Sequence, residues 1–176
     1  MKLIPCLLTL FAIAFASDAF AQDKTDYTLN DGQVHFHVPA GWNAIMEKAD
    51  GNPQAVAFQV PDAAAQGGED SASVTVKTRQ LQGAVTFNAV VQEEFEHAKS
   101  QGGYSSDAAG TDASVHQYSV VRGKTKYFVS DSFTLSGSGS IVTQVRCQRP
   151  LLDKTPAAWA TQFDSACASV VASLKQ

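Results

Sequence analysis

The stretch YFVSDSFTLSGSGSIVTQVRC, residues 127–147, decides the fold of this chain. Residues 127–135 and 141–147 are two runs rich in β-branched and aromatic side chains, which are typical of strands. The five residues between them alternate serine and glycine, a composition that indicates a hairpin loop. Because strands joined by a short loop pair in opposite directions, this stretch predicts an antiparallel sheet.

Further strands are predicted on the N-terminal side of this hairpin. Residues 22–26 are polar and are expected to be irregular, and Asn30-Asp31-Gly32 then indicates a turn. Apolar alternation between turn residues predicts four segments: a strand over 34–38, a hairpin over 43–60, a strand over 73–81 and a strand over 115–121 that completes a meander.

Two helices are predicted from apolar side chains at helical spacing. The first carries a stripe of Phe87, Val90, Val91, Phe95 and Ala98, with Thr86 as its N-cap and Gly102-Gly103 as its stop. The second has Thr155 as its N-cap and Pro156 at its first position. Its apolar face consists of Trp159, Phe163, Ala166, Cys167, Val170, Val171 and Leu174.

This order of elements predicts the α+β class, with a single antiparallel sheet of about six to seven strands and helices packed on it. Residues 22–176 are expected to form one domain.

The first 21 residues predict export. A charged start at Lys2 is followed by an apolar run over residues 3–16 and by the small-residue pattern Ala19-Phe20-Ala21. This is the pattern of a cleaved Sec-type signal peptide, with cleavage after Ala21 and a periplasmic or secreted product. The run is too short for a membrane-spanning helix, which needs roughly 20 residues.

Cys147 and Cys167 are the two cysteines that remain after cleavage. An even pair in an exported protein predicts a disulfide, and a reactive thiol or a metal pair is the alternative. Because Cys147 ends a predicted strand and Cys167 lies on the inner face of the last helix, we expect the bond to hold that helix on the sheet.

Residues 34–42, VHFHVPAGW, resemble the opening of the PsbP/Mog1/DcrB-like group, in which an apolar strand is followed by Pro-x-Gly-Trp. The strand order, the helix over 87–101 and the C-terminal helix support the resemblance over residues 27–174. It implies an α/β/α sandwich on an antiparallel sheet. It also implies a binding or accessory role in the cell envelope or a photosynthetic lumen, and it supplies no catalytic residues.

His35 and His37 are weak candidate metal ligands. Two residues apart on a strand, they point to the same face, but a zinc or copper site needs further ligands. Asp26 and Asp31 are near in sequence without being fixed in space. The alternation of the strand already explains both histidines as solvent-facing residues, so we predict no metal site and no cofactor.

Three other polar groups are interpreted as structural. Glu93, Glu94, Glu96 and His97 include one Glu-x-x-His pair, but a di-iron site needs two, so a solvated helix face is expected. Residues 136–140 lack the strand-to-helix context of a serine nucleophile and are expected to be a hairpin loop. His116 has no evident catalytic partner.

Tyr118 and Tyr127 lie in the predicted meander. If helices cover both faces of the sheet, both are core residues. If one face is open, either tyrosine could anchor a partner protein, because tyrosine suits partly wet interfaces.

The net charge of −4 and the absence of a basic stripe argue against a nucleic-acid partner. The function predicted from the sequence is that of an exported, non-enzymatic protein that binds another protein, as an envelope accessory factor or an immunity-type inhibitor. The alternative is a periplasmic small-molecule or metal carrier that uses a cleft beside the sheet.

Overall fold

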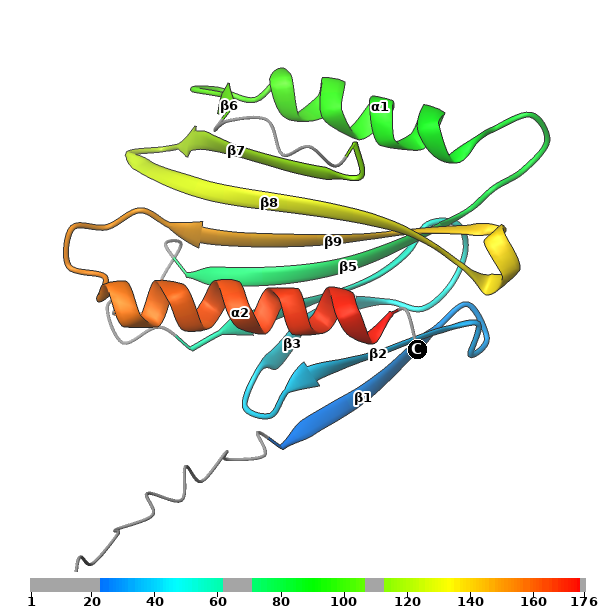
Figure 1. The fold of residues 1–176 in the computed structure, drawn as a ribbon, viewed down its shortest axis with the longest axis horizontal. Coiled ribbons are helices and arrows are strands. Elements are labelled where there is room, and N and C mark those ends of the chain that lie inside the picture. The colour runs from blue at the N-terminus through cyan, green and yellow to red at the C-terminus, as the bar shows by residue number, and fades with distance from the viewer. Residues whose placement is uncertain (1–22, 62–70, 107–112, 175–176) are drawn as a thin grey trace, which may run out of the picture.

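The computed structural model describes residues 23–61, 71–106 and 113–174 (Figure 1). The predicted signal peptide lies outside these residues. The elements, in chain order, are β1 (Lys24–Leu29), β2 (Val34–Pro39), β3 (Asn43–Lys48), β4 (Gln54–Val60), β5 (Ala72–Gln80), α1 (Phe87–Lys99), β6 (Ser105–Ser106), β7 (Val115–Arg122), β8 (Thr125–Ser136), the short 3-10 turn η1 (Gly137–Gly139), β9 (Ile141–Pro150) and α2 (Ala157–Ser173).

Seven of the strands form one antiparallel sheet in the order β3-β4-β5-β9-β8-β7-β6. The hairpin of β8 and β9 is the longest in the chain, and its loop is η1, as the serine and glycine residues predicted. β9 lies between β8 and β5, so this hairpin joins the C-terminal meander to the N-terminal strands.

The prediction of a single sheet is wrong in one respect. β1 and β2 pair with each other and form a separate two-stranded sheet. Lys24 to Asp26, expected to be irregular, are part of β1. The predicted alternation of buried and exposed residues over β2 is confirmed. However, β2 does not join the edge of the large sheet, and its apolar side chains pack against one face of that sheet.

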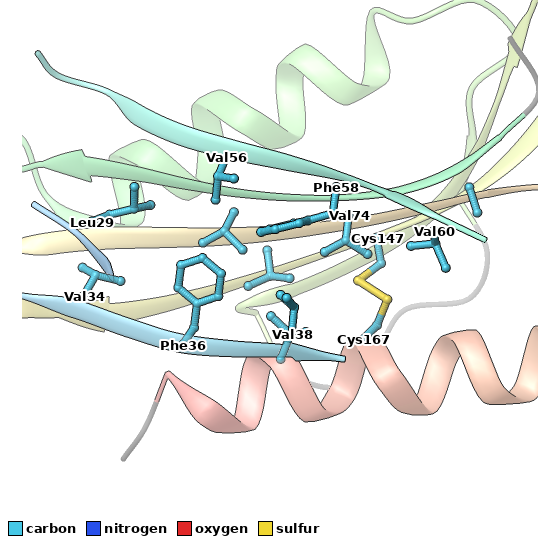
Figure 2. Close-up of a cluster of buried hydrophobic side chains, with 14 of the residues drawn as sticks. Leu29, Val34, Phe36, Val38, Val56, Phe58, Val60, Val74, Cys147 and Cys167 are labelled. Carbon is cyan, nitrogen blue, oxygen red and sulfur yellow. A yellow bond between two sulfur atoms is a disulfide. The ribbon is translucent and has the colours of Figure 1, made fainter. Parts of the chain in front are cut away.

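The larger core lies between this face of the large sheet and the layer made of β2 and α2. Val34, Phe36 and Val38 of β2 face Phe58 of β4, and all four are almost fully buried (Figure 2). The aromatic rings of Phe36 and Phe58 meet edge to face, with centroids 6.4 Å apart. Burying a large apolar side chain contributes roughly 1.5–3 kcal/mol, so this cluster anchors the small sheet.

α1 covers the opposite side of the large sheet. Two smaller apolar clusters lie under it, one around Ala98 and Tyr118 and one around Val91 and Phe133. Thr86 caps the helix as predicted, because its hydroxyl oxygen accepts a hydrogen bond from the Ala89 N–H at 3.2 Å. The protein is therefore a sheet with α1 on one face and α2 with β1–β2 on the other.

α2 begins one residue later than predicted. Pro156, and not Thr155, occupies the N-cap position, and it makes no side-chain capping bond. The fixed φ of proline suits the start of a helix even without such a bond. The expected inner face of α2 is present, with Phe163, Cys167 and Val170 buried.

Candidate functional site: a groove beside α2

A groove of about 440 Å³ runs between α2 and the sheet. Its volume falls within the range of about 300–1,000 Å³ found for ligand pockets. The floor comes from β7, β8 and β9, and one wall comes from α2. The lining residues are Val115, Gln117, Phe128, Ser130, Ser132, Cys147, Asp164, Cys167, Ala168, Val171 and Ala172.

The groove follows from where α2 lies on the sheet. α2 packs against β2 and β9, and in Figure 1 it lies on the β5 side of β9, away from β7 and β8. The helix therefore leaves the neighbouring face of β7 and β8 uncovered, and this face becomes the floor of the groove. Strand side chains alternate between faces, and β8 places Tyr127, Val129 and Asp131 on the α1 side. The alternate positions, Ser130 and Ser132 among them, therefore face the groove.

The groove is mostly apolar, with a few polar groups in its floor. Val115, Phe128 and Val171 supply apolar contact area, while Gln117 and Ser130 supply hydrogen-bonding groups.

Asp164 is the ionisable lining residue of the groove. Both of its carboxylate oxygens accept hydrogen bonds from Arg149, at 3.0 and 3.2 Å. The Arg149 guanidinium also lies over the ring of Phe128, a lining residue, 4.9 Å from its centroid.

The two predicted disulfide cysteines lie in the lining of this groove. Cys147 and Cys167 are at disulfide distance, as predicted, with their Cα atoms 6.3 Å apart and both side chains buried (Figure 2). The bond links α2 to β9, which are the wall and the floor of the groove. It therefore fixes the width of the groove at this point.

His35 and His37 do not meet a set of metal ligands. In the described part of the chain, no group of three or more His, Cys, Asp or Glu side chains is arranged to hold a metal ion. The pairing of β1 with β2 places Asp26 opposite His37, and the Asp26 carboxylate contacts His37 Nδ1. His35 is exposed, and Asp31 is not part of this contact.

Tyr118 and Tyr127 are 1% and 3% exposed. Both rings lie on the α1 side of the sheet, in the cluster that also contains Ala98 and Val129. Both tyrosines are therefore core residues, which is the first of the two alternatives predicted from the sequence, and neither ring is exposed to a partner.

A buried charged cluster lies under α1, where the sequence predicted only a solvated helix face. Asp131 and Arg146 are cross-strand partners, and the Arg146 guanidinium donates to both carboxylate oxygens at 2.8 and 3.0 Å. The Tyr118 hydroxyl and the Gln144 amide each donate to Asp131 at 3.1 Å. Glu94 extends the cluster by accepting a hydrogen bond from Lys77 at 2.5 Å.

The prediction for Glu94 is therefore wrong, while Glu93, Glu96 and His97 are exposed as expected. Glu94 lies three residues after Val91 and four after Val90, so it belongs to the inner stripe of the helix. Its side chain is 14% exposed and lies 3.6 Å from Arg146. The cluster holds α1 on the sheet and does not open into the groove.

The pKa values in this cluster have identifiable causes. Burial by itself raises the pKa of Glu94, but the hydrogen bond and charge of Lys77, together with Arg146, lower it below 4.5 overall. Burial raises the pKa of the Tyr118 hydroxyl, and the charge of Asp131 adds to this. Burial lowers the pKa of His116, whose ring lies 4.2 Å from that of Phe95. The Tyr118 hydroxyl therefore keeps its proton at neutral pH, and the lowered pKa of His116 favours the neutral form of its ring.

Replacing Glu94 with glutamine is expected to destabilise the protein by about 1–2 kcal/mol at pH 7. A carboxyl group whose pKa is lowered on folding stabilises the fold above its unfolded pKa, and this contribution is lost as the pH falls through the folded pKa. Urea unfolding at pH 7 and at pH 3 should show a difference between wild type and variant that shrinks at pH 3. Glu96→Gln, at an exposed Lys99 pair, should change little at either pH; equal losses for both variants would contradict the account.

No helix among the described residues has both the length and the apolar character needed to cross a membrane.

Comparison with known proteins identifies similar folds but does not identify the function. No protein-family model and no curated protein matches the chain. Among solved structures it is similar to LpqN, described as involved in cell envelope biogenesis of Mycobacterium tuberculosis, at 14% identity and a TM-score of 0.53 over 88% of each chain. It is also similar to a mutant of the protein Mog1, at 11% identity and a TM-score of 0.48 over 86% of this chain and 93% of that one.

An antiparallel sheet with helices on both faces is what the sequence resemblance implied. The chain thus has an α+β fold similar to that of LpqN, with a seven-stranded antiparallel sheet and a separate two-stranded sheet. At these identities the likeness concerns the fold alone.

The sequence analysis offered a cleft beside the sheet only within the carrier alternative, and it did not predict the position or the lining of this groove. The available signals were weak: serine at alternate positions of β8 and alanine at Ala168 and Ala172 of α2. Both patterns are also typical of ordinary solvent-facing surfaces, so the groove emerges only when three strands and a helix are placed together.

Proposed function

We propose that this chain is an exported, non-enzymatic protein of the cell envelope that binds a segment of another protein in the groove beside α2. The observation that carries the proposal is the groove itself, which is mostly apolar, has a few polar groups in its floor and has a volume of about 440 Å³. Apolar side chains of a partner would fill it, and Gln117 and Ser130 would bond the partner's backbone.

The chemistry of the lining supports binding over catalysis. Asp164, its ionisable residue, is engaged by Arg149 through two hydrogen bonds, which leaves its carboxylate poorly placed to act as a base. The wall and the floor of the groove are also joined by the Cys147–Cys167 pair. A groove that is already shaped before binding loses less conformational entropy when it is filled, which favours affinity.

Three observations support an envelope location. The leader over residues 1–21 has the composition of a cleaved signal peptide. A disulfide persists in an oxidising compartment such as the periplasm. LpqN, whose fold the chain shares, is described as involved in cell envelope biogenesis.

Ala168→Arg places a long charged side chain at the exposed wall of the groove and is expected to reduce partner binding at least about tenfold, since that charge would lose its water when a partner fills the groove. Ala158→Arg is the matched control, because Ala158 is an exposed residue of α2 that does not line the groove. The measurement is quantitative mass spectrometry of proteins that co-purify with each form from envelope extract. Equal recovery of every partner with both variants would contradict the proposal.

A small-molecule carrier is the second candidate function, and the volume of the groove favours it, since a drug-sized ligand fits such a space. Native mass spectrometry of protein purified without denaturation distinguishes the two functions. A carrier retains a bound mass of a few hundred daltons that Ala168→Arg loses, whereas a protein-binding groove shows none.

A further inference from the structure

Two smaller pockets lie along the flank of α2 that faces away from the groove. The first, of about 160 Å³, is lined by Lys24, His37, Val38, Pro39, Gln162, Ser165, Ala166 and Ser169. The second, of about 230 Å³, is lined by Ala40, Trp42, Val60, Pro61, Trp159, Gln162, Phe163 and Ala166. Because both include Gln162 and Ala166, the two pockets adjoin and form one elongated site, here called the flank site.

The first pocket has the chemistry of an anion site. Lys24 brings a positive charge from β1, and Ser165 and Ser169 bring hydroxyl groups from one face of α2. His37 is oriented by the contact of its Nδ1 with Asp26, so Nε2 is the ring nitrogen that Asp26 does not engage. An ammonium group and several neutral donors suit a carboxylate and disfavour a metal cation.

The second pocket has the chemistry of a ring site. Trp159 is held in place by a hydrogen bond from its Nε1 to the Pro61 carbonyl oxygen at 3.1 Å and by stacking on Phe163 at 5.5 Å and 19°. Trp42 is half-buried and packs against the larger core. Two fixed indole rings and a proline favour a flat apolar group, since aromatic rings stack on one another in offset or edge-on arrangements.

We propose that the flank site binds a small aromatic carboxylate, with its carboxylate beside Lys24 and His37 and its ring against Trp42 and Trp159. This site is separate from the groove, so the inference goes beyond the proposed function. It also gives His37 a role other than that of a metal ligand: with Lys24, its ring lines the proposed carboxylate end of the site.

Phenylacetate is a suitable probe, with phenylacetamide and acetate as comparisons that lack the charge and the ring. The chain contains two tryptophans, and both line the flank site, so their indole N–H signals in an NMR spectrum report this site alone. Phenylacetate is expected to shift both signals saturably, at concentrations about tenfold lower than either comparison compound requires.

Lys24→Gln is expected to weaken phenylacetate binding about tenfold and to leave phenylacetamide binding unchanged. Lys48→Gln, an exposed lysine on β3, is the control and should change neither. The indole signals of each unliganded variant report whether it folds as wild type does. Equal binding of acid and amide, unshifted indole signals, or an unaltered phenylacetate affinity in Lys24→Gln would overturn the proposal.

Discussion

Replacing Asp131 with alanine is expected to destabilise the protein by about 3–5 kcal/mol. Asp131 is 1% exposed and accepts hydrogen bonds from Arg146, Tyr118 and Gln144. Without it, the Arg146 guanidinium stays largely buried with Glu94 as its remaining counter-ion, and a tyrosine hydroxyl loses its acceptor. Urea unfolding at pH 7 measures the loss as a lower transition midpoint.

The chain provides a matched control for this prediction. Asp164 makes the same two-bond contact with Arg149, but its side chain is 46% exposed. Exposed ion pairs contribute about 0–1 kcal/mol, so Asp164→Ala should cost much less than Asp131→Ala. Equal losses at the two sites would show that burial of the cluster under α1 does not determine its energy.

A double variant separates the free energy that the Asp131–Arg146 pair contributes from the cost of leaving one of its charges unpaired. Asp131→Leu combined with Arg146→Leu removes both charges together. Because replacing a buried ion pair with apolar residues is often nearly neutral, the double variant should recover most of the stability that Asp131→Ala loses. A double variant as unstable as the single one would mean that the pair itself stabilises the fold.

Removing the disulfide is expected to have the second large effect. Cys147 and Cys167 are 20 residues apart, and closing a loop of that length stabilises a fold by about 3 kcal/mol in the chain-entropy model. The double variant Cys147→Ala/Cys167→Ala should therefore unfold at a lower urea concentration than wild type. Reduction with dithiothreitol should bring wild type down to the level of the variant.

The same reductant serves as the control, because it should leave the double variant unchanged. Thiol labelling of unfolded protein taken directly from cells adds a check on the compartment. An exported, oxidised protein should take up label at neither Cys147 nor Cys167 before reduction. Free thiols at both positions would contradict the oxidising location.

Much of the fold could be predicted because its signals are local. Alternation over residues 34–38, the loop over 136–140 and the stripe from Phe87 to Ala98 each specify an element from a few neighbouring residues. The cysteine pair was predictable too, because two cysteines in a chain that is expected to be exported leave few alternatives. These features need no knowledge of the partner strands.

The parts that could not be predicted depend on distant partners. The alternation of β2 shows one buried face, but the same pattern serves an edge strand and a separate small sheet. Glu94 is a charged residue on the apolar stripe of α1, and its partners Lys77 and Arg146 lie on β5 and β9, far from it in sequence. The groove requires β7, β8, β9 and α2 at once, and none of its polar residues forms a motif.

The most direct test of the groove as a binding site is photo-crosslinking in living cells. A photoreactive amino acid is introduced at Gln117, at Ala168 or at Ala158, and the crosslinked proteins are identified by mass spectrometry. We expect the same partner to be captured from Gln117 in the floor and from Ala168 in the wall, and not from Ala158 on the outer side of α2. A partner captured from Ala158 but from neither groove position would contradict the account.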